Sequence, residues 1–462
     1  MARIEQDDGT AFEATCDVLV IGAGAAGLVA ALRAREAGAE VVVIERDPVP
    51  SGSTALSAGL IPAAGTRFQR EAGIRDSKAG FVSDILAKAH GEPDRAAVER
   101  VVDVVGDALE WLADRHGLPF SVIDNFTYPG HSARRMHGLP SRSGAELMDR
   151  LRSAAEAAGV AIVTEATATT LHVAGRRITG VGLVRPDGST DRIGCRALVL
   201  ACNGYGGNRD LVAAHIPALR DALYFGHPGN QGDALLWGEA LGAATRHLSG
   251  HQGHGSVAHP HGILITWATI TEGGFQVNRL GRRFADEARG YSESAASVIA
   301  QPDGVAFTVF DSRIAGIARQ FEDFRNAEAA GAVIVADSVE SLAARMHVPA
   351  DALADTFAEV SALKAAGARD GFGRDFSGVP PLAAPFAAVK VTGALFHTQG
   401  GLVVDAEARV LARDGTAFPN LFAAGGAACG VSGAEASGYL SGNGLLTAVA
   451  YGWLAGAEAA EA

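Results

Sequence analysis

The chain has 462 residues, of which 48% are hydrophobic and 20% charged, and its formal net charge is −13. This length exceeds what one hydrophobic core usually supports, and the composition excludes a disordered chain, so we expect two folded domains. The acidic balance, without any run of Lys and Arg, argues against nucleic acid as a partner. The polar N-terminal segment and the lack of a long apolar run argue against a secretory signal and membrane insertion, so we expect a cytoplasmic location.

The first predicted elements form a strand–helix–strand unit. An apolar strand covers residues 16–21, an Ala-rich helix covers 28–38, and a second strand covers 40–45. The change of hydrophobic period from two to about 3.6 is typical of a βαβ unit.

A glycine-rich loop joins the first strand to the first helix. Gly22 permits a tight turn, Gly24 lets the backbone approach a pyrophosphate, and Gly27 lets the helix pack closely on the strand. The helix N-terminus supplies N–H donors for the phosphates. Glu45, at the end of the second strand, is placed to accept hydrogen bonds from ribose hydroxyls. The segment therefore predicts a dinucleotide site.

The middle of the chain alternates between helical and β-rich stretches. Helices are expected over 78–90, 94–116 and 144–159, followed by strands from 160 through a turn at 186–188 to a buried strand over 196–202. From about residue 247 the sequence changes to His- and Gly-rich loops, a short meander and charged helices. We place a second domain there.

The C-terminal part returns to strands and glycine turns and ends in an apolar helix. A strand beginning at Asn420 runs into Gly425 and Gly426, and a second glycine turn, Ser441–Gly442–Asn443, opens the last helix. A second helix N-terminus suits the pyrimidine edge of a flavin, where negative charge develops on reduction. This favours FAD over NAD.

Cysteines and histidines give no metal signal. The four cysteines lack the spacings of iron–sulfur, c-type haem or zinc sites. Five histidines crowd residues 247–261, but their spacings fit no helix-borne ligand pair and no carboxylate joins them. We expect no metal.

Several motifs, in order, resemble the fumarate reductase and succinate dehydrogenase flavoprotein superfamily, and within it the 3-ketosteroid dehydrogenases. They are the glycine loop and the segments at 52–59, 203–207, 229–233, 278–287, 397–401 and 441–446. The resemblance implies an α/β fold in which a Rossmann-type FAD-binding domain (1–246 and 376–462) carries an inserted α+β capping domain (247–375). It also implies an active site over the isoalloxazine.

The loop and the resemblance together indicate the cofactor contacts. Where membrane-bound members carry a histidine bonded covalently to FAD, this chain has Ser53, so we expect noncovalent FAD. The expected contacts are Gly22, Gly24, Ala25, Ala26, Gly27, Glu45, Arg46, Ser53, Thr54, Ser57, Ala58, Gly59, Ala201, Asn203, Gly204, Asp233, Gly425, Gly426, Ser441, Gly442, Asn443, Leu445 and Leu446.

Two positions depart from fumarate reductase. Tyr291 stands where the resemblance places a proton-delivering arginine, and Tyr439 stands where it places a carboxylate-binding arginine. Tyrosines at both positions are similar to the 3-ketosteroid dehydrogenases, in which one tyrosine takes the proton next to a ketone and another holds the ketone oxygen with a backbone N–H. His254 and His397 match positions that touch substrate in fumarate reductase. We expect these four residues to be catalytic.

The expected reaction is α,β-desaturation of a cyclic ketone, either a 3-ketosteroid or a smaller cyclohexanone, with an external electron acceptor. A tyrosine base needs a lowered pKa, for which Arg289, Arg134, Arg135 and His137 are candidate sources of charge. Arg282 and Arg283 are expected to be surface and hinge charges.

Alternatives stay open. Tyr291 can be a packed aromatic, and the alignment can slip at Tyr439, because residues 435–438 lengthen the family loop. Tyr128 can lean over the pocket or lie in an ordinary loop. A reductase of fumarate or urocanate type and a flavin-binding scaffold without turnover are the competing functions. A homo-oligomer is possible.

Overall fold

The computed structural model describes residues 2–124 and 127–462, which form two compact units. Unit 1 comprises Met1–Ile216, Gly226–His251 and His397–Ala462. Unit 2 comprises Pro217–Phe225 and Gln252–Phe396. The sequence placed its boundaries after residues 246 and 375, whereas the compact units divide after residues 251 and 396. The assignment of one unit to the cofactor and the other to the substrate stays a prediction.

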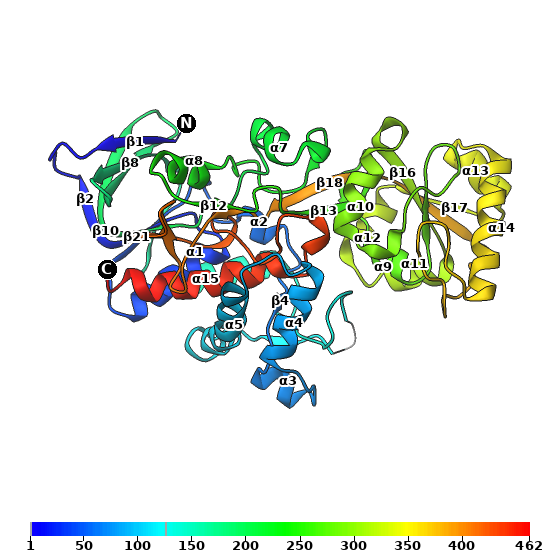
Figure 1. Ribbon diagram of the computed structural model, residues 1–462, viewed down its shortest axis with the longest axis horizontal. Helices are drawn as coiled ribbons and strands as arrows, with labels where there is room; N and C mark the ends of the chain where they lie inside the picture. The colour runs from blue at the N-terminus through cyan, green and yellow to red at the C-terminus, as the bar shows by residue number, and fades with distance from the viewer. Residues whose placement is uncertain (1, 125–126) are drawn as a thin grey trace. The chain divides into compact units, whose positions relative to one another are not determined.

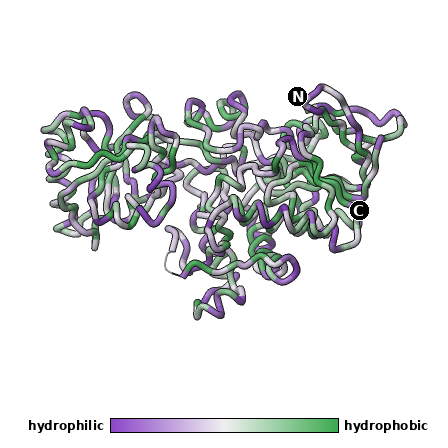
Figure 2. Tube along the Cα trace, turned by 180° about the vertical axis from the view of Figure 1, so that it is seen from behind, coloured by the Kyte–Doolittle hydropathy of each residue, from purple (hydrophilic) through white to green (hydrophobic). Residues whose placement is uncertain are grey.

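Unit 1 is built on a nine-stranded sheet whose main path runs β1-β8-β9-β10-β2-β3-β7, with β21 beside β10 and β20 beside β21. Figure 1 labels β1, β2, β8, β10 and β21 of this sheet. Its central strands β2, β3 and β10 are apolar and buried, as expected for parallel strands covered on both faces. Figure 2 shows hydrophobic residues concentrated along the strands near the C-terminus. The strands are β1 (Arg3–Gln6), β2 (Ala14–Ile21), β3 (Val41–Ile44), β7 (Ala161–Val163), β8 (Thr167–Ala174), β9 (Arg177–Val184), β10 (Thr190–Leu200), β20 (Arg409–Leu411) and β21 (Ala417–Ala423).

Two small sheets and the helices complete unit 1. The small sheets contain β4 (Ile61–Pro62), β5 (Ser121–Val122) and β6 (Met136–Gly138), and β12 (Thr245–Arg246) with β19 (Gly401–Leu402). The helices are α1 (Ala25–Glu36), α2 (Gly52–Ala55), α3 (Arg67–Glu71), α4 (Lys78–Lys88), α5 (Arg95–His116), α6 (Gly144–Ala157), α7 (Arg209–His215), α8 (Asp233–Ala240) and α15 (Asn443–Ala459).

Helices α1 and α15 come from opposite ends of the chain and lie side by side (Figure 1). Glycines on α15 allow this approach: a Cβ on Gly452 would lie 2.5 Å from the Ala26 carbonyl oxygen, and one on Gly456 would lie 2.2 Å from that of Ala30. Neither position has room for a side chain. The packing brings the two glycine-flanked helix N-termini into one unit.

Unit 2 contains a seven-stranded sheet with the order β14-β13-β18-β16-β15, in which β11 and β17 also pair with β18. Its strands are β11 (Leu223–Tyr224), β13 (His251–Ala258), β14 (Ile263–Leu264), β15 (Phe275–Val277), β16 (Val305–Asp311), β17 (Val333–Ala336) and β18 (Phe386–Thr398). Its helices are α9 (Ala268–Thr271), α10 (Tyr291–Ile299), α11 (Ser312–Ala318), α12 (Glu322–Ala329), α13 (Val339–Met346) and α14 (Ala350–Ala366).

A buried ion network holds the segment that leads into α10. The Glu287 carboxylate accepts hydrogen bonds from Arg283 at 2.8 Å and from Arg374 at 3.0 Å, and Arg283 also pairs with Asp370. The expectation that Arg283 is a surface or hinge charge is wrong, because its side chain is only 3% exposed. The ion pairs of Arg283 with two buried carboxylates compensate the cost of removing its charge from water.

No helix in the described part of the chain is both long enough and apolar enough to cross a membrane.

Candidate cofactor and active site

The glycine loop has the geometry of a tight phosphate-binding turn. Gly22 has a φ of +104°, and a Cβ there would lie 2.5 Å from the Ala201 carbonyl oxygen. A Cβ on Gly27 would lie 1.9 Å from the Gly22 carbonyl oxygen, so this glycine is required by packing. Gly24 differs, since a Cβ there would meet only the Thr54 hydroxyl at 3.6 Å. Space beside Gly24 is therefore open to a ligand.

Glu45 fixes the loop from the end of β3. Its buried carboxylate accepts hydrogen bonds from the backbone N–H groups of Ala23, at 2.9 Å, and Asp47, at 3.0 Å. Each carboxylate oxygen has a second lone pair. Glu45 can thus hold the loop and still accept a hydroxyl, and its contact with a ribose stays a prediction.

The N-termini of α1 and α15 both begin at glycines and lack a side-chain cap. Gly24 precedes α1, and Gly442, with a φ of +89°, precedes α15. The first residue of α15, Asn443, is fully buried, and its Oδ1 has no hydrogen-bond partner. The open backbone beside Gly24 suits the phosphates, and the unsatisfied buried Asn443 Oδ1 suits the N–H edge of a flavin nucleotide.

Other predicted cofactor residues also gather in unit 1. Arg46 and Asp233 form an ion pair of 3.1 Å at the start of α8. The Ser53 hydroxyl accepts hydrogen bonds from the His227 N–H, at 3.2 Å, and from Asn230, at 2.9 Å.

The turns that carry Asn203 and Gly426 are tightly interlocked. Asn203 has a φ of +64°, and its Oδ1 accepts the Gly204 N–H at 2.8 Å. A Cβ on Gly426 would lie 2.2 Å from that Oδ1. Ser57 stabilises the turn at Gly59 through a 3.1 Å hydrogen bond.

The remaining predicted contacts lie on or beside elements of unit 1. They are Ala25 and Ala26 on α1, Thr54 on α2, Ala58, which is exposed after α2, Gly425 after β21, Ser441 before α15, and Leu445 and Leu446 on α15.

Tyr439 and His397 lie together in unit 1, beside the N-terminus of α15. Their ring centroids are 5.4 Å apart, and a Cβ on Gly444 would lie 2.9 Å from His397 Nε2 and 3.7 Å from the Tyr439 hydroxyl. Burial lowers the pKa of His397 to about 4, so the imidazole is neutral near pH 7. Burial raises the pKa of Tyr439, while hydrogen bonds from the backbone N–H groups of Gly444 and Gly442 act in the opposite direction.

These contacts refine the role expected for the loop. The Gly442 N–H is directed to the Tyr439 oxygen, and the Asn443 N–H donates to the Leu440 carbonyl at 3.0 Å. In this geometry the Gly442 and Asn443 N–H groups are already engaged, and a ketone oxygen held by the Tyr439 hydroxyl together with a backbone N–H of this loop stays a prediction. Because its oxygen accepts N–H bonds, Tyr439 is left with its own O–H as the donor. Tyr128 is an electrostatic neighbour of this hydroxyl.

Tyr291 and His254 lie together in unit 2, within an aromatic cluster. His254 is stacked on Tyr291 at 5.0 Å and on Phe396 at 5.4 Å, and it meets Trp267 edge-on at 5.5 Å. Its Nδ1 accepts the Ser256 N–H at 3.1 Å. Burial lowers the pKa of His254 to about 3. His254 is thus a neutral ring with its proton on Nε2, a fixed hydrogen-bond donor.

Tyr291 is placed by the start of α10, which begins after Gly290. The next residue, Ser292, accepts the Gly253 N–H at 3.0 Å and ties α10 to β13. The structure therefore brings together one predicted Tyr–His pair in each unit. Sequence reasoning missed Trp267 and Phe396, which follow no motif; the rarity of aromatic residues in this chain was the only available signal.

Two of the candidate sources of positive charge for a tyrosine base, Arg135 and His137, are unsuited to that role. Arg135 is fully buried and paired with both Asp76 and Asp84, so its charge is compensated. Burial lowers the pKa of His137 to about 4, so this ring is neutral. These residues stabilise unit 1 and supply no free charge.

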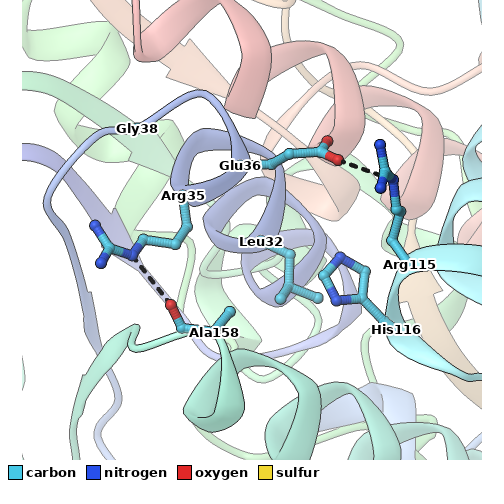
Figure 3. A pocket seen from close by; sticks show the side chains of 7 residues that line it. All are labelled: Leu32, Arg35, Glu36, Gly38, Arg115, His116 and Ala158. Carbon is cyan, nitrogen blue, oxygen red and sulfur yellow. Dashed lines mark hydrogen bonds and ion pairs between the residues drawn. The ribbon is translucent and has the colours of Figure 1, made fainter.

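A shallow pocket of about 460 Å³ lies at the far end of α1 from the glycine loop (Figure 3). Its walls carry the Glu36–Arg115 ion pair and the hydrogen bond from Arg35 to the Ala158 carbonyl. Because α1 has 12 residues, or about 18 Å of helix, this pocket is not the predicted dinucleotide site. In the described ranges, no three His, Cys, Asp or Glu side chains are arranged to hold a metal ion.

Comparison with known proteins identifies the family. The chain belongs to the FAD binding domain family, whose model matches residues 17–445. A probable fumarate reductase of Shewanella frigidimarina is 30% identical over 452 residues, covering 97% of this chain and 75% of the relative. The 4-oxocyclohexanecarboxylate 2-dehydrogenase of Sinomonas cyclohexanicum is 27% identical over 558 residues, covering 97% of this chain and 96% of the relative.

Comparison with solved structures supports the same family. The open conformation of a flavocytochrome c3 fumarate reductase matches with a TM-score of 0.84 and 28% identity, covering 98% of this chain and 79% of that one. The 3-ketosteroid-Δ4-(5α)-dehydrogenase of Rhodococcus jostii RHA1, solved with 4-androstene-3,17-dione, matches with a TM-score of 0.76 and 25% identity over the whole of both chains.

The chain is therefore an FAD-dependent oxidoreductase of the fumarate reductase and ketosteroid dehydrogenase flavoprotein family. The expected α/β fold and the expected cofactor, FAD, are confirmed. Its substrate is a separate question.

Proposed function

We propose that this flavoprotein is a dehydrogenase that introduces a C=C bond next to the carbonyl of a cyclic ketone, either a 3-ketosteroid or a smaller cyclohexanone. The observation that carries the proposal is the pair of tyrosines, Tyr291 and Tyr439, at the two positions where the resemblance to fumarate reductase places arginines. Two guanidinium groups would bind a dicarboxylate in bidentate fashion, and phenols cannot. A ketone needs one proton acceptor and one donor to its oxygen instead.

The proposed roles follow from the local contacts. Tyr439 donates its O–H to the ketone oxygen, because its own oxygen is engaged by the Gly442 and Gly444 N–H groups. Tyr291 takes the proton from the α carbon, for which its phenol must first be ionised. FAD, when bound, supplies the acceptor for the hydride that leaves the β carbon. The reaction requires one substrate molecule to reach both tyrosines, and an external acceptor to remove the electrons.

The two neutral histidines add donors. His254 carries its proton on Nε2, and His397 presents Nε2 beside the Tyr439 hydroxyl. A carboxylate substituent on the substrate ring, as in the 4-oxocyclohexanecarboxylate named for one relative, would give the His254 donor an oxygen partner separate from the ketone oxygen. We therefore favour a small cyclic ketone acid over a steroid.

Rapid-mixing reduction of the FAD-loaded protein by 4-oxocyclohexanecarboxylate, without oxygen, tests these roles. Tyr291→Phe and Tyr439→Phe should each keep their FAD and slow flavin reduction at least about 100-fold. Tyr451→Phe removes a buried phenol hydroxyl on α15 outside the proposed machinery and should leave the rate unchanged. Unimpaired reduction of the Tyr291→Phe protein would remove the proposed base.

A second candidate is a reductase of unsaturated acids, of fumarate or urocanate type. The histidines favour it, since His254 and His397 occupy positions that touch substrate in fumarate reductase, and so does the 30% identity to a probable fumarate reductase. The missing arginines argue against it.

A further inference from the structure

A continuous chain of hydrogen bonds runs from the first residue of α15 to His397. The Asn443 Nδ2 donates to the Ser432 hydroxyl at 2.9 Å, and the Ser432 hydroxyl donates to Gln399 Oε1 at 2.6 Å. The Gln399 Nε2 then faces His397 Nδ1 at 3.1 Å. Asn443, Ser432 and Gln399 are all at least 96% buried, so water does not compete for these bonds. Every donor in the chain is directed toward the histidine.

Two groups compete for His397 Nδ1. The Gln399 Nε2 at 3.1 Å is a donor, and the Thr398 carbonyl oxygen at 3.4 Å is an acceptor. A neutral imidazole carries one proton, so Nδ1 can satisfy only one of the two. The nearer donor, fixed from behind by Ser432, leaves Nδ1 unprotonated and puts the proton on Nε2. Without that donor, the Thr398 carbonyl would draw the proton to Nδ1.

The tautomer matters because of what Nε2 faces. Nε2 and the Tyr439 hydroxyl oxygen both lie near the position that a Cβ on Gly444 would take, at 2.9 Å and 3.7 Å from it. With the proton on Nε2, the histidine and the tyrosine both present donors. With the proton on Nδ1, the histidine presents a lone pair, which repels a substrate oxygen.

We infer that Gln399 and Ser432 are positioning residues that hold His397 in its Nε2–H tautomer, so that His397 and Tyr439 donate to the same substrate oxygen. The second half of this inference rests on the proposed function. The first half concerns the imidazole alone and is measured without turnover.

Nitrogen NMR of the FAD-loaded protein, labelled with ¹⁵N in its histidine rings, reads the tautomer directly. The His397→Gln variant identifies the signal. We expect the wild-type ring to be neutral at pH 7 with Nδ1 unprotonated. Gln399→Leu should move the proton to Nδ1, and the isosteric Gln399→Glu should protonate Nδ1 as well, since a carboxylate can only accept. Gln320→Leu, on an exposed glutamine of unit 2, should change nothing.

Ser432→Ala removes the middle of the chain and frees the Gln399 amide to rotate, so we expect a mixture of the two tautomers. A wild-type ring protonated on Nδ1 would overturn the inference, because Nδ1 would then donate either to the Thr398 carbonyl or to a Gln399 amide that presents its oxygen. So would an unchanged tautomer in both Gln399 variants.

Turnover separates this inference from the proposed function. With a cyclic ketone, Gln399→Leu should lower kcat/KM about tenfold or more, through the loss of one donor. A changed tautomer with unchanged kcat/KM would overturn the shared-oxygen half. If no ketone is oxidised by the wild-type protein while the NMR results are as expected, the proposed function fails and the tautomer assignment stands.

Discussion

Replacing Gly24 by alanine separates a glycine required by the cofactor from one required by the fold. The Gly24 backbone has a φ of −78° and a ψ of −174°, an extended conformation that alanine adopts without strain. The added methyl group would meet only the Thr54 hydroxyl, at 3.6 Å, which is ordinary van der Waals contact. We therefore expect the free energy of unfolding of the apoprotein to change by less than about 0.5 kcal/mol.

FAD binding should respond differently. The methyl group would stand at the N-terminus of α1, in the open space that the dinucleotide phosphates need. We expect the Kd for FAD to rise about 10- to 1,000-fold, which corresponds to about 1.4–4 kcal/mol. Titration of the apoprotein with FAD, followed by flavin fluorescence, measures the Kd, and urea unfolding of the same apoprotein measures stability.

Two further glycines serve as controls. Gly27→Ala places its methyl group 1.9 Å from the Gly22 carbonyl oxygen and should cost the apoprotein about 1–3 kcal/mol of stability. Gly316→Ala, in α11, meets no atom within 4 Å and should gain up to about 1 kcal/mol from helix propensity. A Gly24→Ala protein that binds FAD as tightly as the wild type would refute the reasoning.

Two predictions concern buried charges in unit 2. Burial alone would raise the pKa of Glu287, but the guanidinium groups of Arg283 and Arg374 hold that pKa below its usual value. The contribution of the Glu287 carboxylate to stability is therefore present at neutral pH and is lost as the pH falls below about 4.5. Glu287→Gln should lower the free energy of unfolding in urea by about 3–5 kcal/mol. Glu328→Gln, at a more exposed ion pair, should lower it by less than about 1 kcal/mol. Equal losses would contradict a stabilising role for the buried ion network. Burial lowers the pKa of Lys364 to about 8 from 10.5, so the unfolded chain binds more protons between these values and stability should rise with pH from about 8 to 10.5. Lys364→Met should abolish that rise, and a pH profile identical to the wild type would contradict the assignment.

The sequence predicted those parts of the molecule that local chemistry determines. The turn at Gly22 and the close packing at Gly27 follow from the absence of a side chain, and the structure has both. The four residues Tyr291, Tyr439, His254 and His397 were selected only through the family resemblance, and the pairing of His254 with Tyr291 and of His397 with Tyr439 was not predicted. No periodicity in the chain connects these residues.

The parts that sequence reasoning missed depend on long-range packing. Arg283 looks like a surface charge until Asp370, far along the chain, is placed beside it. Gln399 and Ser432 have ordinary surface-type side chains, and their burial appears only when the loop before α15 packs on the end of β18. The pairing of the Asn443 N–H with the Leu440 carbonyl was missed for a different reason: it depends on the local turn, which a motif does not specify.

Anaerobic mixing of the purified, FAD-loaded protein with substrates tests the central proposal most directly. We predict that 4-oxocyclohexanecarboxylate bleaches the flavin absorbance and leaves an unsaturated ketone acid, and that fumarate does not reoxidise the dye-reduced protein at a comparable rate. Rapid fumarate reduction, together with no bleaching by any cyclic ketone, would contradict the proposal and favour an acid reductase.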